Sequence, residues 1–116
     1  MKERMKMTDI QKFKENREVF LKDIEAFIRK ERKEMEFDKE DKEVTEKIIS
    51  LITDCCSNIY KFALISENHI YHKPELAEKV FEKLKGALSG MRTCRCISLH
   101  TKNTILKMVK KETGVR

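Results

Sequence analysis

Four cysteines in the 116-residue sequence stand in two close pairs, Cys55-Cys56 and Cys94-x-Cys96. Cysteines this close together can bind zinc or form disulfides. On an α-helix, however, adjacent residues point about 100° apart and residues two positions apart point about 200° apart, so neither pair directs both sulfurs at one ion. We therefore expect Cys55 and Cys94 to be buried as small apolar side chains and the other two thiols to be incidental. A disulfide is not expected in an intracellular chain.

Ser66, His69 and His72 lie close together in the segment before Pro74. Two imidazoles at this spacing could bind a metal ion on a helical turn, and a serine beside a histidine could act as a nucleophile. No acidic or cysteine residue stands beside the histidines at ligand spacing, and no third orienting group is evident for Ser66. The sequence also contains no Glu-x-x-His pattern of the di-iron helical bundles. It therefore predicts no metal site, no cofactor and no small-molecule substrate.

Positive charge is concentrated toward the C-terminal end. The formal net charge is +6, and no acidic residue occurs from Leu84 to Lys111. Cations along a helix face can neutralise phosphates of a nucleic-acid backbone or meet an acidic protein surface, although many charged helix faces are only solvated. Phe81 is the only aromatic residue after Tyr71, so stacking on bases is poorly supported. The candidate binding residues are Lys85, Arg92, Arg95, Lys102, Lys107, Lys110 and Lys111.

The segment Arg95-Cys-Ile-Ser-Leu-His100 contains an Arg-x4-His pattern. Over these six residues it resembles the HEPN family of helical-bundle ribonucleases, except that Cys96 replaces the polar residue usual after the arginine. The resemblance implies an RNA-cleaving or RNA-binding protein in which Arg95 holds a phosphate and His100 acts as acid or base in a dimer groove. On one straight helix the two side chains would point about 140° apart, so their cooperation would require that dimer.

The elements that must position these residues are predicted to be helices. The sequence has only three glycines and one proline, which excludes phosphate-cradling glycine loops and the frequent turns of an all-β fold. Apolar residues recur at helical spacings of three, four and seven. The expected helices cover about residues 8–36, 42–66, 74–89 and 91–112. We expect Thr8 or Asp9 to cap the first helix and Asp41 to cap the second. Pro74 is expected in the first turn of the third helix.

The last two helices are also compatible with one long C-terminal helix, because the apolar register continues from Leu84 to Met108. We favour a break at Ser89-Gly90, with Gly90 in the left-handed cap conformation. An unbroken helix would extend about 15 Å beyond the others at about 1.5 Å per residue.

The sequence therefore predicts one all-α domain over residues 1–116, an antiparallel bundle of three long or four shorter helices. The expected core comprises Ile24, Phe27, Ile48, Leu51, Ile52, Cys55, Ile59, Phe62, Val80, Leu84 and Ile105. The apolar run Phe62 to Ile65 is far short of the roughly 18 to 20 residues of a membrane span. The charged N-terminal residues also lack the pattern of a signal peptide. We expect an intracellular protein, cytoplasmic or nuclear, without a membrane partner.

These features favour a non-enzymatic helical interaction module that binds a protein partner or self-associates. Contact of its basic C-terminal helix with a nucleic-acid backbone is an additional expectation. The alternative is a HEPN-like protein that cleaves or binds RNA through Arg95 and His100.

Overall fold

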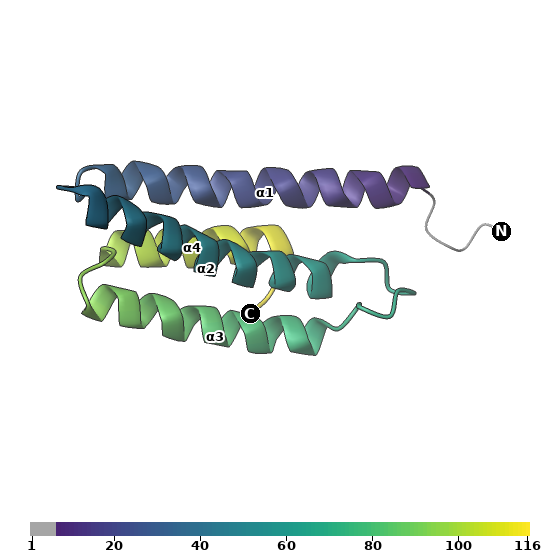
Figure 1. Ribbon diagram of the computed structural model, residues 1–116. Helices are drawn as coiled ribbons and strands as arrows, with labels where there is room; N and C mark the ends of the chain where they lie inside the picture. Colours follow the sequence, from purple (N-terminus) through teal and green to yellow (C-terminus); the bar gives the residue numbers. More distant parts are fainter. Residues whose placement is uncertain (1–6) are drawn as a thin grey trace.

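The computed structural model describes residues 7–116, which form four α-helices (Figure 1). Helix α1 spans Met7–Lys33, α2 spans Lys39–Leu64, α3 spans Pro74–Thr93 and α4 spans Leu99–Thr113. No strand occurs in this range, so the predicted all-α bundle is confirmed. Among the same residues, no helix is both long enough and apolar enough to cross a bilayer.

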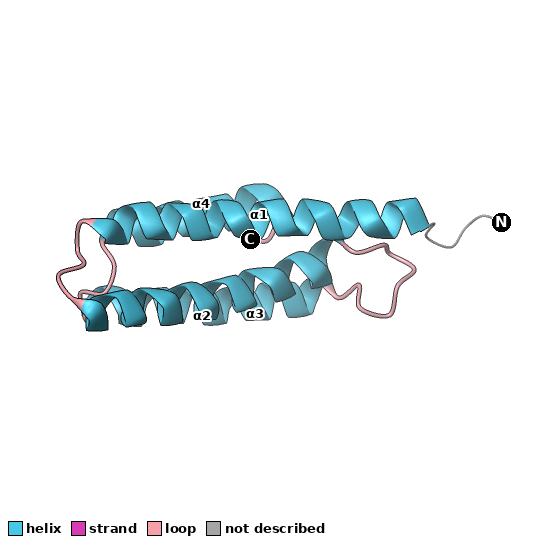
Figure 2. Ribbon diagram, turned by 45° about the horizontal axis from the view of Figure 1, so that its top comes forward, coloured by secondary structure: helices cyan, strands magenta, loops and turns pink. Residues whose placement is uncertain are grey.

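The helices form two layers in which successive helices run in opposite directions. Helices α1 and α4 form one layer, and α2 and α3 form the other (Figure 2). Helix α2 packs against each of the other three helices. Helix α4 has 15 residues whereas α1 has 27, so α1 continues well past the end of α4 (Figure 1). The described chain is elongated, at 57 × 24 × 19 Å.

The start of α2 differs from the prediction because Asp38, not Asp41, is its N-cap. The Asp41 amide donates to Asp38 Oδ1 and the Asp38 amide donates to Asp41 Oδ2, each at 3.1 Å. This reciprocal capping box satisfies two amides that the helix itself leaves without partners, so α2 begins at Lys39. Helix α1 begins at Met7, so Thr8 and Asp9 lie inside it and the position before Met7 is outside the described residues. Pro74 begins α3 as predicted.

The predicted break between the last two helices exists, but its predicted position was wrong. Helix α3 continues through Ser89 and Gly90 to Thr93, and α4 begins only at Leu99. A glycine inside a helix costs only about 1 kcal/mol relative to alanine. Here the flanking Leu88 is buried and Met91 packs against the core, which stabilises the helical turn around Gly90 enough for it to continue.

The core largely follows the predicted apolar pattern. Of the predicted residues, those buried are Ile24, Ile48, Ile52, Ile59, Leu84 and Ile105, and those half-buried against them are Phe27, Cys55, Phe62 and Val80. Leu51 is 47% exposed, so its assignment to the core was wrong. Since Ile48 and Ile52 both point inward, Leu51 is turned about 100° away from Ile52 toward solvent.

Candidate functional site

The predicted basic residues lie on two helices and the connection between them. Lys85 and Arg92 belong to α3, Arg95 to the α3–α4 connection, and Lys102, Lys107, Lys110 and Lys111 to α4. Lys85 Nζ forms an ion pair with Glu82 at 3.1 Å and lies 5.6 Å from the ring centroid of Phe81. Lys110 Nζ lies 5.8 Å from the same centroid. One cation from α3 and one from α4 therefore lie near the same ring.

Two other lysines of α4, Lys107 and Lys111, lie on the flank of the helix that carries His100. His100 packs against Phe27 of α1, with 6.3 Å between the ring centroids. Lys107 and Lys111 follow His100 at helical spacings of seven and eleven, so they share its flank. Lys110 follows Lys107 by three residues, so Lys107, Lys110 and Lys111 lie within about 100° of one another around α4, and all three are exposed.

Arg95 and His100 are not brought together within one chain. Arg95 is in the α3–α4 connection and lines two hollows beside Met35 of the α1–α2 connection. His100 lies against Phe27 and lines neither hollow. The acid or base role that the HEPN resemblance implies for His100 therefore has no phosphate-binding arginine next to it in the monomer.

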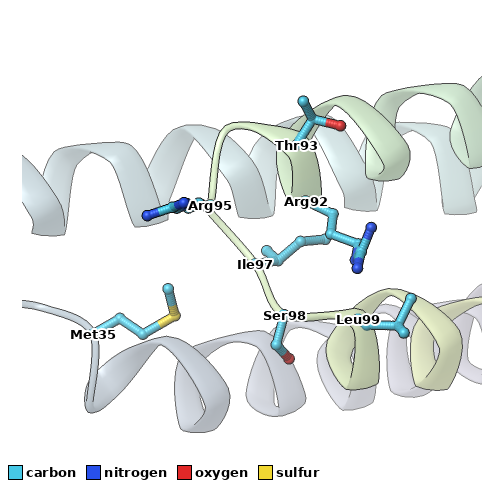
Figure 3. Close-up of a pocket in the computed structure, with 7 residues that line it drawn as sticks. All are labelled: Met35, Arg92, Thr93, Arg95, Ile97, Ser98 and Leu99. Carbon is cyan, nitrogen blue, oxygen red and sulfur yellow. The ribbon is translucent and has the colours of Figure 1, made fainter.

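The first hollow opens where α3 ends and α4 begins. Its volume is about 530 Å³, and its lining residues are Met35, Arg92, Thr93, Arg95, Ile97, Ser98 and Leu99. Figure 3 shows Arg92 extending from α3 into the space toward α4, whereas the guanidinium of Arg95 lies on the side of Met35. The first turn of α4 contains no acidic residue, so the positive end of its dipole adds to the cationic character of this hollow.

A second hollow adjoins the first through Met35 and Arg95. Its volume is about 490 Å³, and its lining residues are Arg32, Glu34, Met35, Phe37, Asp41, Val44, Cys94, Arg95 and Cys96. We call the two hollows together the loop-end groove, because the α1–α2 and α3–α4 connections form it. Phe37 is 88% exposed and Leu99 is 47% exposed. The groove thus joins exposed apolar side chains to two exposed arginines.

The buried guanidinium of Arg32 holds the two connections together. Its Nε donates to Thr45 Oγ1 at 2.8 Å, Nη1 donates to the Cys96 carbonyl at 2.5 Å, and Nη2 donates to the Asp41 carbonyl at 3.2 Å. The fork of guanidinium donors can reach acceptors on three segments at once, which an ammonium on a single stem does less well. Arg32 therefore fixes the α3–α4 connection against α1 and α2.

Arg95 adopts a backbone conformation that usually belongs to glycine. Its φ is 63°, and it is the only non-glycine residue with positive φ among residues 7–116. The Cys96 amide donates to the Met91 carbonyl at 2.8 Å and the Arg95 amide donates to the Arg92 carbonyl at 3.0 Å. These two bonds form a Schellman motif at the end of α3, with Arg95 at the position that most often carries glycine. Left-handed backbone costs a residue with a Cβ about 1–2 kcal/mol.

Arg92 and Arg95, the two exposed arginines of the groove, take part in none of the ion pairs found in the described part of the chain. Arg29, on the side of α1, instead pairs with two carboxylates. Arg29 Nη2 lies 2.8 Å from Glu25 Oε2 and Nη1 lies 2.5 Å from Glu46 Oε2. Hydrogen bonding to Arg29 lowers the pKa of the Glu46 carboxyl. Glu25 and Glu46 are thus engaged by Arg29, and none of the ion pairs found between described residues involves Arg92 or Arg95, which leaves both available to an external anion.

The cysteines are all free thiols. The prediction that Cys94 is buried was wrong, whereas Cys55 does pack against the core. Cys56 is fully buried, Cys55 and Cys96 are half-buried, and Cys94 is exposed. Cys56 lies four residues after Ile52 and three before Ile59 and so shares their inward face, while Cys94 lies beyond the last turn of α3. Burial raises the pKa of Cys56 to about 12. Within residues 7–116, no group of three or more His, Cys, Asp or Glu side chains is arranged to hold a metal ion.

Ser66 and His69 bind the backbone of their own connection and not each other's side chains. Ser66 Oγ accepts from the Asn68 amide at 3.4 Å, and His69 Nδ1 accepts from the Tyr71 amide at 3.1 Å. The arrangement does not orient a serine nucleophile toward a histidine base.

Sequence reasoning identified Arg92 and Arg95 but missed the apolar half of the groove. Phe37 stands alone beside a charged stretch, and Leu99 follows the Ser98 cap. A single apolar residue next to a helix boundary gives no sequence signal of exposure, because exposure depends on how the two connections meet.

Comparison of the chain with protein-family models, curated proteins and solved structures gives no significant match. The resemblance to the HEPN ribonucleases therefore rests on the segment from Arg95 to His100 alone.

Proposed function

We propose that the protein is a non-enzymatic interaction module whose loop-end groove binds a segment of a partner protein. The segment that fits best carries one or two carboxylates beside an exposed apolar side chain. Its carboxylates would bind Arg92 and Arg95, and its apolar side chain would pack between Phe37 and Leu99.

The observation that carries this proposal is the position of Arg95. A long cationic side chain occupies a left-handed position at which glycine would relieve strain, and its guanidinium lies between the two hollows. Backbone strain of this kind tends to occur at ligand-binding sites, where the gain in binding offsets the cost in stability. Arg95 and Arg92 can each form bidentate hydrogen bonds with a carboxylate.

The apolar lining supports a protein partner. Aromatic side chains and arginines are enriched at protein interfaces. Phe37 supplies the exposed aromatic side chain of the groove, and Leu99 adds exposed apolar surface. Glu34 and Asp41 also line the second hollow, so its charge is mixed, which suits a peptide better than the uniform negative charge of a nucleic acid.

Nucleic-acid backbone contact is a second candidate, favoured by the exposed Lys107, Lys110 and Lys111 near the end of α4. It would use a different surface from the groove. Substituting all three lysines by glutamate should then lower affinity for single-stranded RNA and reduce the dependence of that affinity on salt concentration. Unchanged RNA affinity in this variant would exclude this candidate.

The groove is tested with short peptides selected from a display library in which acidic and apolar residues alternate. The affinity of the best peptide is measured by fluorescence anisotropy with the wild type, with Arg92→Gln/Arg95→Gln and with Phe37→Ser. We expect each variant to bind at least about tenfold more weakly, equivalent to about 1.4 kcal/mol.

Lys107→Gln/Lys111→Gln is the matched control, because it removes the same charge outside the groove, and it should bind the peptide like the wild type. Two results would contradict the proposal: equal affinity for all variants, or selection of equally tight peptides from a library with amides in place of the acids. Light scattering on the same samples determines whether the preferred partner is another copy of the chain. If it is, the wild type should form a dimer in the absence of peptide, and Phe37→Ser should be a monomer.

A further inference from the structure

A separate cavity lies beside the α2–α3 connection. Figure 1 shows this connection at the opposite end of the bundle from the α1–α2 and α3–α4 connections. Its volume is about 290 Å³, and it lies between the N-terminal turns of α1, the C-terminal turns of α2 and that connection. Its apolar walls are formed by Ile10, Phe13, Ile65 and Tyr71. This size is close to the lower limit of small-molecule sites, which favours a small ligand.

The charged lining of this cavity is entirely cationic. Lys14, Arg17 and Lys61 line it, and no acidic residue does. Lys61 Nζ lies 4.7 Å from the ring centroid of Tyr71 and 5.1 Å from that of Phe62. None of the ion pairs found between described residues involves these three cations. Within residues 7–116, the side-chain partners found for Lys61 and Arg17 are aromatic rings, which leaves their charge available to an anion.

The wall formed by the connection is held in place by its own hydrogen bonds. His72 Nδ1 donates to the Ile65 carbonyl, and the Lys73 amide donates to the Phe62 carbonyl, each at 2.9 Å. The rings of His69 and Tyr71 stack with 5.4 Å between centroids. Tyr71 is thus held in the cavity lining before any ligand binds, which lowers the entropic cost of binding.

We infer that this cavity binds a small apolar monocarboxylate. The apolar part would pack against Phe13, Ile65 and Tyr71, and the carboxylate would lie at the rim among Lys14, Arg17 and Lys61. A mainly apolar lining with a few charged groups at one side is the usual arrangement for such a ligand. A ligand without charge would leave the clustered cations unneutralised, and an anion without an apolar part would leave the walls in contact with water.

The test is a calorimetric titration of the full chain with octanoate and with 2-naphthoate, which separate an alkyl ligand from an aryl ligand. Octanol is the control that lacks the charge, and acetate is the control that lacks the apolar part. We expect at least one of the two carboxylates to bind saturably, about tenfold or more tightly than octanol, and acetate not to bind. If neither carboxylate binds, or if octanol binds as tightly as octanoate, the inference is wrong.

The variant Lys14→Gln/Arg17→Gln/Lys61→Gln tests the assignment of the cations. It should bind the carboxylate about tenfold more weakly and octanol as the wild type does, and the octanol measurement also shows that the cavity remains folded. Lys107→Gln/Lys110→Gln/Lys111→Gln removes the same charge elsewhere and should leave carboxylate affinity unchanged. Equal losses in the two variants would show a general effect of net charge and would overturn the assignment.

Discussion

Replacing the buried Arg32 by methionine tests how the two connections are held at the groove. Arg32 is 4% exposed, and its donors bind acceptors on Thr45, Asp41 and Cys96. Methionine is flexible, apolar and able to fill an irregular space, but it donates no hydrogen bond. The substitution therefore isolates the hydrogen bonds from the packing.

The expected loss follows from the three acceptors. Thr45 Oγ1 still donates to the Asp41 carbonyl at 3.0 Å, so these two groups keep a partner, whereas the Cys96 carbonyl loses the bond that ties its connection to α1. A hydrogen bond from a charged donor contributes about 1.5–3 kcal/mol, and a buried acceptor left without a partner costs about 1–3 kcal/mol. Methionine also removes the guanidinium charge that folding has to desolvate, which offsets part of this loss of stability. We expect a net destabilisation of about 2–4 kcal/mol, or about 8–16 °C in Tm at about 4 °C per kcal/mol.

Urea unfolding followed by circular dichroism measures this loss, and Arg29→Met is the matched control. Arg29 lies three residues earlier on α1, is 46% exposed and is ion-paired at the surface. Surface ion pairs contribute about 0–1 kcal/mol, so the control should lose at most about 1 kcal/mol. If the two variants differ by less than about 1 kcal/mol, Arg32 does not hold the connections together as described.

Three further predictions concern Arg95 and the cysteines. Arg95→Gly should raise the free energy of unfolding by about 0.5–1 kcal/mol, because glycine adopts positive φ without strain, whereas Arg95→Ala should not; equal urea midpoints for the two variants would contradict this account of the strain. Compared with Cys56→Ala, the wild type should lose about 1.4 kcal/mol of stability per pH unit above about pH 9, because the native thiol, with its pKa raised to about 12, keeps a proton that the unfolded thiol releases. If the difference in the free energy of unfolding between the wild type and Cys56→Ala stays constant with pH, Cys56 is not buried. Iodoacetamide should alkylate Cys94 first and Cys56 last in the native protein, as judged by peptide mass spectrometry, and early alkylation of Cys56 would contradict its burial.

The apolar periodicity of the sequence was sufficient to predict an antiparallel bundle, but it left three long or four shorter helices open and misplaced the helix ends. Ser89-Gly90 suggested a helix stop, yet burial of Leu88 keeps α3 helical beyond it. The actual stop uses Arg95 in the left-handed conformation and a Ser98 cap. An arginine gives no sequence signal for such a turn, because glycine is the residue that this position favours.

The candidate site was predictable only in part. Arg92 and Arg95 were found because they lie in a stretch without acidic residues. In sequence, Arg32 cannot be distinguished from its neighbours Arg29 and Lys33, which share the same charged helix end. Its burial, like the exposure of Phe37, depends on contacts between segments far apart in sequence, which local patterns do not report.

The most direct test of the proposed function is an NMR titration of isotope-labelled protein with the selected acidic and apolar peptide. We predict that amide shift changes fall at residues 35–37, 44 and 92–99, which form the loop-end groove, and that they disappear in Arg92→Gln/Arg95→Gln. Changes confined to residues 102–111 of α4, or changes of the same size in that variant, would contradict the assignment of the groove as the binding surface.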